Sequence, residues 1–304
     1  MTTRADRPPV WQLVSIRQAD GTPAAAVEVG GECGIPEVLQ GQLSLLDVMR
    51  AWPAVADALR SVDLDAVRRV EGAEILAPLT YPSKVLCSGP NFRDHLAEMG
   101  ESGLGESWVP YFFFKPPTTT VVADGAAVLV SGDPAERPDY EAELAVVIGV
   151  GGRDIGVGVA MDHVAGYLVS NDISMRGPFK RDTPAAPFVW DWAAQKCADT
   201  SLPMGRGIVP AWLVDDVQDL RIRTEVNGVM KQDGWTGDMV FGVAELVAQA
   251  SRITTLEPGD VILTGTPAGV GAGRGEFLAP GDIVRVSIEG IGSLQNPIHR
   301  RENG

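Results

Sequence analysis

The stretch Asp139-Tyr140-Glu141-Ala142-Glu143-Leu144-Ala145-Val146-Val147-Ile148-Gly149 decides the fold. Its continuous apolar run predicts a strand over residues 141–148 that is buried on both faces. Because side chains at i and i+2 of a strand point the same way, we expect Glu141 and Glu143 to project side by side. Two adjacent carboxylates repel unless one is protonated or a cation lies between them. The pair predicts a site for Mg²⁺ or Mn²⁺; the alternative is two ordinary acids at a solvated strand end.

A second apolar strand ends in an acid that would complete this metal site. Residues 166–171 form the strand, Asp172 follows it, and Arg176 lies four residues further on. Asp172 would supply a third oxygen ligand, and three carboxylates leave positions of an octahedral ion open for water and substrate. The alternative is an Asx-type turn that leaves the strand, for which Asn-Asp is well suited.

A histidine and a glutamate lie three residues apart on a short helix predicted over residues 92–99. Asn91 is expected to cap this helix, and the spacing places His95 and Glu98 on one helix face. A carboxylate beside an imidazole raises its basicity and fixes its tautomer, which suits a base that activates water. The alternative is a surface ion pair. Glycine and serine are frequent beyond the helix, so the segment 92–110 is also predicted to be a lid over the substrate.

Composition indicates a folded, acidic protein. The 304 residues include 45% hydrophobic side chains and carry a net charge of −15. This charge repels nucleic acid and anionic lipid, so neither is an expected partner, and a carboxylate substrate would need a local cation. The three cysteines are scattered, and neither a secretory signal nor a bilayer-length apolar run is recognisable. These features predict a cytoplasmic protein without a membrane span.

The remaining pattern predicts an α+β fold that is mainly β. Residues 1–75 are expected to form a small α+β domain without chemistry of its own, and residues 76–304 the catalytic domain. Strands do not alternate regularly with helices, which excludes a doubly wound or barrel α/β fold. The expected strands are 11–16, 24–29, 85–88, 111–115, 127–130, 141–148, 166–171, 220–226, 260–264 and 282–288, and the expected helices are 44–59, 92–99, 156–164 and 239–251.

The order of these motifs resembles the fumarylacetoacetate hydrolase family. The resemblance covers roughly residues 76–290 and implies a mixed β-roll catalytic domain, a small N-terminal domain and a homodimer. The matching strings are Asn91-Phe92-Arg93-Asp94-His95, Phe114-Lys115-Pro116, Asp139 to Leu144, Asn171-Asp172 with Arg176, Lys196, and Thr264-Gly265-Thr266-Pro267-Ala268-Gly269-Val270-Gly271.

Carried over position by position, the resemblance implies a role for each site residue. The carboxylates would hold one Mg²⁺ or Mn²⁺ per subunit, the His–Glu pair would activate water, and the lysine would neutralise or protonate charge at the substrate. The implied metal ligands are Glu141, Glu143 and Asp172, the catalytic residues His95, Glu98 and Lys196, and the substrate contacts Arg176, Thr266, Gly265, Phe92 and Arg93.

The implied reaction is hydrolysis of a C–C bond in an acylpyruvate- or fumarylpyruvate-like 2,4-dioxo acid, which releases pyruvate through a metal-stabilised enolate. Decarboxylation of an oxaloacetate-like acid, or isomerisation or hydration of an unsaturated 2-oxo diacid, would use the same site. A catalytically silent metal-binding protein is the alternative of another class. The chain departs from the family at Phe92, Gly177, Phe179 and Arg206, all expected near the substrate.

Overall fold

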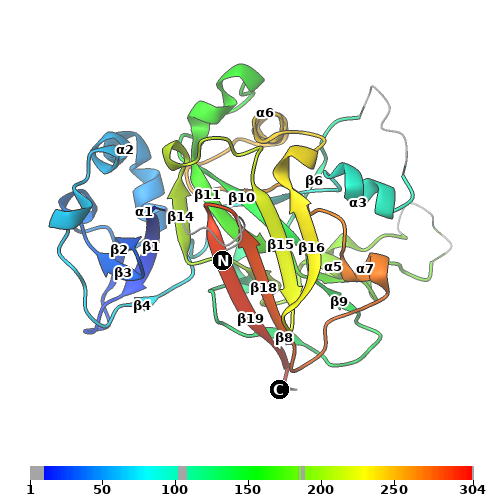
Figure 1. Ribbon diagram of the computed structural model, residues 1–304. Helices are drawn as coiled ribbons and strands as arrows, with labels where there is room; N and C mark the ends of the chain where they lie inside the picture. The colour runs from blue at the N-terminus through cyan, green and yellow to red at the C-terminus, as the bar shows by residue number, and fades with distance from the viewer. Residues whose placement is uncertain (1–9, 102–107, 184, 186–188, 303–304) are drawn as a thin grey trace.

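Strand β10 (Ala142–Ile148), which the opening motif predicts, is completely buried in the middle of the larger sheet. The structure, a computed structural model, describes residues 10–101, 108–183, 185 and 189–302 (Figure 1). Within these residues the order of the ten-stranded sheet is β3-β2-β1-β14-β11-β10-β17-β5-β6, with β4 paired to β1. Its strands are β1 (Gln12–Arg17), β2 (Pro23–Val29), β3 (Glu32–Gly34), β4 (Glu74–Ile75), β5 (Val85–Ser88), β6 (Phe112–Phe114), β10, β11 (Val164–Asn171), β14 (Gly207–Pro210) and β17 (Val261–Leu263).

A smaller sheet packs against β10 and β11. In the described part of the chain it has five strands in the order β16-β15-β18-β19-β8. Two further strand pairs, β7 with β13 and β9 with β12, connect the loops around the site. The bounds are β7 (Val121–Val122), β8 (Val128–Val130), β9 (Pro138–Asp139), β12 (Ser174–Met175), β13 (Leu202–Pro203), β15 (Arg221–Val226), β16 (Val229–Trp235), β18 (Ile283–Ile288) and β19 (Gly292–Arg300).

The two faces of β10 belong to two different cores. Leu144, Val146 and Ile148 pack against the smaller sheet, whereas Ala145 and Val147 pack with the N-terminal helices. The alternation follows from the period of two in a strand. It explains why β10 is apolar from Leu144 to Ile148. The two sheets confirm the mainly β, α+β class.

The N-terminal residues extend the larger sheet, because β1 pairs with β14. One helix was expected at 44–59, but two are found: α1 (Leu45–Arg50), capped by Ser44, and α2 (Trp52–Arg60). Pro53 lies in the first turn of α2, and its missing N–H cannot continue the hydrogen bonds of α1. The domain boundary at residue 75 remains a prediction.

Few helices cover the sheets. They are α3 (Arg93–Glu98), α4 (Pro117–Thr120), α5 (Trp192–Lys196), α6 (Val243–Ile253) and α7 (Gly271–Arg274). The helix expected at 156–164 is a 3₁₀-helix, Val157–His163. Strands β16 and β19 were not predicted, because polar residues and Pro297 interrupt their apolar pattern. No helix of the described residues is long and apolar enough to cross a membrane.

Candidate metal and catalytic site

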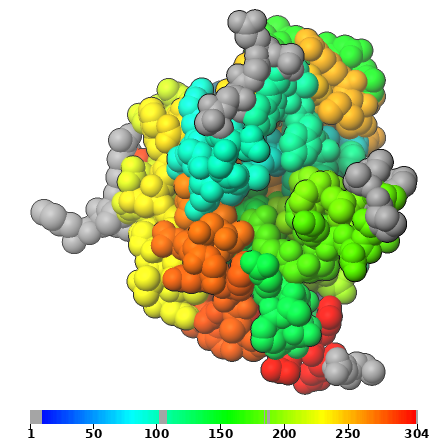
Figure 2. Space-filling model, turned by 90° about the vertical axis from the view of Figure 1, so that its right-hand side faces the viewer, coloured from blue at the N-terminus to red at the C-terminus, as the bar shows by residue number. Residues whose placement is uncertain are grey.

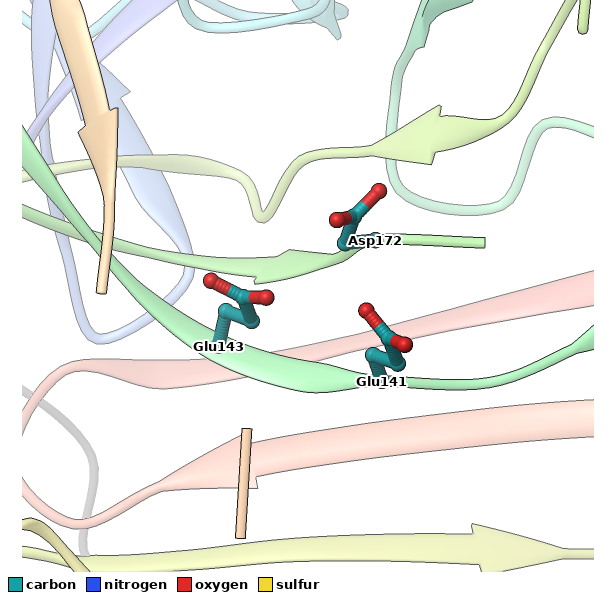
Figure 3. A group of neighbouring side chains, drawn as sticks. All are labelled: Glu141, Glu143 and Asp172. Atoms are coloured by element: carbon teal, nitrogen blue, oxygen red, sulfur yellow. The ribbon is translucent and has the colours of Figure 1, made fainter. Parts of the chain in front are cut away.

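Three buried carboxylates converge where β10 begins and β11 ends (Figure 3). The antiparallel register pairs Ala142 with Asn171, so Glu141, Glu143 and Asp172 lie at the same end of this strand pair. One oxygen atom from each carboxylate lies within 4.8 Å of the others. The geometry agrees with the metal ligands expected from the sequence.

Electrostatics distinguishes the two glutamates. Burial raises the pKa of Glu143 well above its usual range, and the charges of Asp172 and Glu141 raise it further. Burial also acts on Glu141, but Lys196 and Arg176 outweigh it and lower the pKa of that carboxyl. Among the described residues no cation forms an ion pair with Glu143, which accepts a hydrogen bond from the amide of Gly265 at 2.6 Å.

Lys196 connects two of the three carboxylates. Its Nζ donates to Oε2 of Glu141 at 2.6 Å and to Oδ2 of Asp172 at 2.7 Å. Burial lowers the pKa of Lys196, but both carboxylates outweigh it and the net shift is upward. Lys196 is the last residue of α5. Asp191 caps the N-terminus of this helix, because its side chain accepts a hydrogen bond from the backbone amide of Ala194 at 2.9 Å. The lysine is therefore held as a cation beside the carboxylates.

Asp139 and Arg176 connect the carboxylates to the glycine-rich loop. Arg176 donates through Nε to Asp139 at 2.9 Å and contacts Glu141 through Nη2. Asp139 also accepts hydrogen bonds from the amides of Gly271 and Ala272 at 2.6 and 3.0 Å. Sequence reasoning gave Asp139 no role, although it opens the motif that decided the fold.

The donor set fits a hard divalent cation. The three candidate ligands offer only carboxylate oxygens, which Mg²⁺ and Mn²⁺ accept. A cation beside Glu143 would provide the positive charge that this buried carboxylate lacks. The residues present are therefore suited to hold one ion.

His95 and Glu98 form the pair that their spacing predicted. Nδ1 of His95 lies 2.9 Å from Oε2 of Glu98, and Oε1 of Glu98 accepts from the amide of Gly269 at 3.0 Å. Burial raises the pKa of Glu98, but the bonds from His95 and Gly269 outweigh it and lower the pKa. An ionised Glu98 accepts the Nδ1 proton, so the basic atom of His95 is Nε2.

The expectation that Asn91 caps α3 is wrong. Phe92 occupies the cap position and makes no side-chain cap hydrogen bond. The side-chain Nδ2 of Asn91 instead donates to the backbone carbonyls of Thr264 and Phe241. It thereby joins the start of α3 to the end of β17. The central residues of the predicted lid, 102–107, lie outside the described residues.

One cavity of about 450 Å³ brings the charged groups together. Figure 2 looks onto its face, where the cyan segment with α3, the orange segment with α7 and the light-green segment with α5 meet. Asp172 contacts Lys196 but is not part of the cavity wall. Sequence reasoning also missed four of the five aromatic side chains that line it, namely Tyr111, Phe113, Trp190 and Trp192. The predicted site residues that line the cavity are His95, Glu98, Glu141, Glu143, Arg176, Lys196, Gly265 and Thr266.

Four residues expected near the substrate do not line this cavity: Phe92, Arg93, Gly177 and Arg206. Phe92 is completely buried in the hydrophobic core. Arg93 donates through Nη1 to the carbonyl of Met239 at 2.7 Å. Arg206 pairs with Glu28 of β2, so it connects the N-terminal strands to the rest of the sheet. By contrast, Phe179 does lie in the cavity wall.

Known proteins resemble this chain in sequence and in fold. The model of the fumarylacetoacetate (FAA) hydrolase C-terminal family matches residues 84–299. Oxaloacetate tautomerase YisK of Bacillus subtilis (strain 168) is 41% identical over 226 residues, 73% of this chain and 72% of the relative. The crystal structure of a HpcE protein from Mycobacterium smegmatis has a TM-score of 0.79 at 30% identity and covers 95% of this chain and 99% of that one.

A second solved structure resembles the chain along nearly its whole length. It is maleylpyruvate hydrolase from Sphingobium sp. SYK-6 in complex with manganese(II) and pyruvate, with a TM-score of 0.77 at 25% identity over 96% of this chain and all (100%) of that chain. Members with these names are enzymes. The three clustered carboxylates of this chain lie in a matching fold. The family match spans more than half of the sequence. The chain belongs to the fumarylacetoacetate hydrolase family.

Proposed function

We propose that this protein is a divalent-metal-dependent hydrolase that cleaves a C–C bond of an acylpyruvate-like 2,4-dioxo acid and releases pyruvate. The supporting observation is that the His95–Glu98 pair, the carboxylates of Glu141 and Glu143, and Lys196 line one cavity. A base for water and a site for a 2-oxo acid are therefore close enough to act on one small molecule.

Glu141, Glu143 and Asp172 would hold one Mg²⁺ or Mn²⁺. When bound, such an ion supplies a Lewis acid for the carboxylate and 2-oxo oxygens of a 2-oxo acid, and it lowers the energy of negative charge that develops there. It would also provide the cation that an acidic protein needs to bind an anionic substrate.

The chain's own residues would move the protons. Nε2 of His95 takes a proton from water while Glu98 holds Nδ1, and the water oxygen bonds to the C4 carbonyl carbon. The C3–C4 bond then breaks, its electron pair stays on C3, and the acyl fragment leaves as a carboxylic acid. Lys196 stabilises the negative charge on the three-carbon fragment. The proton that His95 took from water is then delivered to C3, which completes pyruvate and restores the base.

Tautomerisation of oxaloacetate is the second candidate. The Bacillus subtilis relative carries that name at 41% identity. His95 would move a proton between C3 and the 2-oxygen, and no water would attack. Both candidates share the enolate charge, so the attacking water is what distinguishes them.

A substrate assay tests the proposal. Purified protein with Mg²⁺ or Mn²⁺ should convert acetylpyruvate into equal amounts of acetate and pyruvate, and chelation should stop the reaction. Enol–keto exchange of oxaloacetate is followed by absorbance in parallel. Rapid exchange without any acetate from acetylpyruvate would reject hydrolysis in favour of the second candidate.

We also propose that the protein is a cytoplasmic homodimer in which residues 1–75 form a small N-terminal domain. The family resemblance supports the dimer, and a small hydrophobic cluster drawn entirely from residues 14–75, which includes Val14, Ile16 and Ala26, supports the domain. Light scattering in solution should give twice the chain mass of 32.2 kDa. A monomer at micromolar concentration would contradict the dimer.

A further inference from the structure

Five aromatic side chains, here called the aromatic wall, line one side of the cavity: Tyr111, Phe113, Phe179, Trp190 and Trp192. Each ring contacts at least one other, and Trp192 contacts three of them. Trp192 stacks on Phe113 with ring centroids 5.1 Å apart, and Phe179 lies 5.0 Å from Trp192 and 4.8 Å from Trp190. Aromatic pairs at such distances form a continuous apolar surface with defined geometry.

The aromatic wall begins beside the charged groups and continues to the cavity mouth. Nζ of Lys196 lies 5.0 Å from the ring centroid of Phe113. Farther out, Trp192 is 36% and Trp190 is 53% exposed. Large exposed rings at the rim of a cavity mark a surface that an apolar ligand group can cover.

The cavity offers no cation for a second carboxylate of the substrate. Among the described residues its lysine and arginine are Lys196 and Arg176, and both are hydrogen-bonded to buried carboxylates. His95 is paired with Glu98. The sequences 102–107, 184 and 186–188 contain neither lysine nor arginine. A diacid would leave its distal carboxylate without a partner, which is costly at an apolar wall.

Gln195 is the polar exception. It lies on α5 between Trp192 and Lys196, lines the cavity and is only 1% exposed. Its Oε1 has no hydrogen-bond partner among the described residues. Buried side-chain oxygens rarely remain unpaired. A ligand hydroxyl in the cavity, such as the enol O–H of a 2,4-dioxo acid, would supply the donor that this oxygen lacks.

From these observations we infer that the substrate carries an uncharged, planar apolar group at its acyl end, which packs on the aromatic wall while Gln195 accepts the enol hydroxyl. A 4-aryl-2,4-dioxo acid has this chemistry. The inference rests on the proposed hydrolase function for the reaction, but the predicted order of ligands does not depend on turnover.

Three substrates test the inference in the holoenzyme. With Mg²⁺ present, kcat/KM for benzoylpyruvate should exceed that for acetylpyruvate and for the diacid fumarylpyruvate by about tenfold or more, the range that apolar pocket contacts provide. Trp190→Ala should lower the benzoylpyruvate-to-acetylpyruvate ratio at least severalfold, whereas Trp190→Phe should keep most of it. Trp235→Ala is the matched control, because Trp235 is 42% exposed and does not line the cavity.

Binding provides a readout without catalysis. Calorimetric titration in the presence of Mg²⁺ should show phenylpyruvate binding about tenfold more tightly than pyruvate or 2-oxoglutarate. Gln195→Leu should weaken the binding of a ligand in its enol form. If none of the three dioxo acids releases pyruvate but this order of binding holds, the hydrolase proposal fails and the aromatic specificity stands. If 2-oxoglutarate binds as tightly as phenylpyruvate, or Trp190→Ala leaves the ratio unchanged, the inference is overturned.

Discussion

Nζ of Lys115 lies 2.7 Å from Oδ1 of Asp172, and both side chains are completely buried. Lys115 follows β6, and its ammonium group also donates to the carbonyls of Ile173 and Ser201 at 2.9 and 3.0 Å. Asp172 thus lies between two lysines, with Lys196 at its other oxygen. Lys115 is a positioning residue, because it sets the orientation of a candidate metal ligand without lining the cavity.

Lys115→Met should destabilise the protein strongly. The substitution leaves the buried Asp172 with an unpaired charge on one oxygen, so we expect the free energy of unfolding to fall by about 3–5 kcal/mol. Urea denaturation in EDTA measures it. Lys231→Met, which breaks the partly exposed pair with Glu276, should cost at most about 1 kcal/mol. An equally small loss for Lys115→Met would mean that the ion pair does not hold Asp172.

Removing one carboxylate should abolish metal binding. Glu143→Gln keeps the shape of the side chain but loses its charge, and we expect affinity for Mn²⁺ to fall by at least about 100-fold, since even outer-shell changes cost 10–100-fold. Calorimetry measures the affinity, and activity should be lost with it. Glu276→Gln serves as the control. Full activity of Glu143→Gln with unchanged Mn²⁺ affinity would rule Glu143 out as a ligand.

His95→Ala should separate hydrolysis from decarboxylation, which the family resemblance also allows on this site. Loss of the base that activates water should reduce hydrolysis of acetylpyruvate by about 10²–10⁴. Decarboxylation of oxaloacetate needs no attacking water and should fall less. His299→Ala, at an exposed histidine, should change neither rate. Equal small losses of His95→Ala on both substrates would remove the His95–Glu98 pair from the mechanism.

The hydrogen bonds of Glu98 should make part of the stability depend on pH. Because the folded protein lowers the pKa of Glu98 below its ordinary 4.5, its contribution is present above that pH and is lost as the pH falls through the lowered pKa. Native protein should therefore be more stable than Glu98→Gln at about pH 6, and the difference should shrink below about pH 4. Denaturation at several pH values measures this. A pH-independent difference, or the same trend in the exposed control Glu71→Gln, would contradict it.

Local pattern predicted much of the fold and of the site. The apolar run of β10 indicated burial on both faces, and the alternation of its side chains placed Glu141 and Glu143 together. Helical spacing likewise placed His95 beside Glu98. By contrast, β16 and β19 have irregular patterns, because one strand lies at a sheet edge and the other contains Pro297. Neither could be distinguished from a loop.

By itself, the sequence determined which side chains share a face within one element, because the strand period of two and the helix period of 3.6 are properties of the local backbone. Only the tertiary structure decided which elements meet. The pairing of Ala142 with Asn171 brings Asp172 to the glutamates, and the packing of α5 brings Lys196 and Trp192 to the same cavity. Lys115 acquires its role in the same way, since 57 positions of chain separate it from Asp172. Contacts between segments so far apart in the sequence are decided by the burial of whole surfaces, to which every segment of the chain contributes.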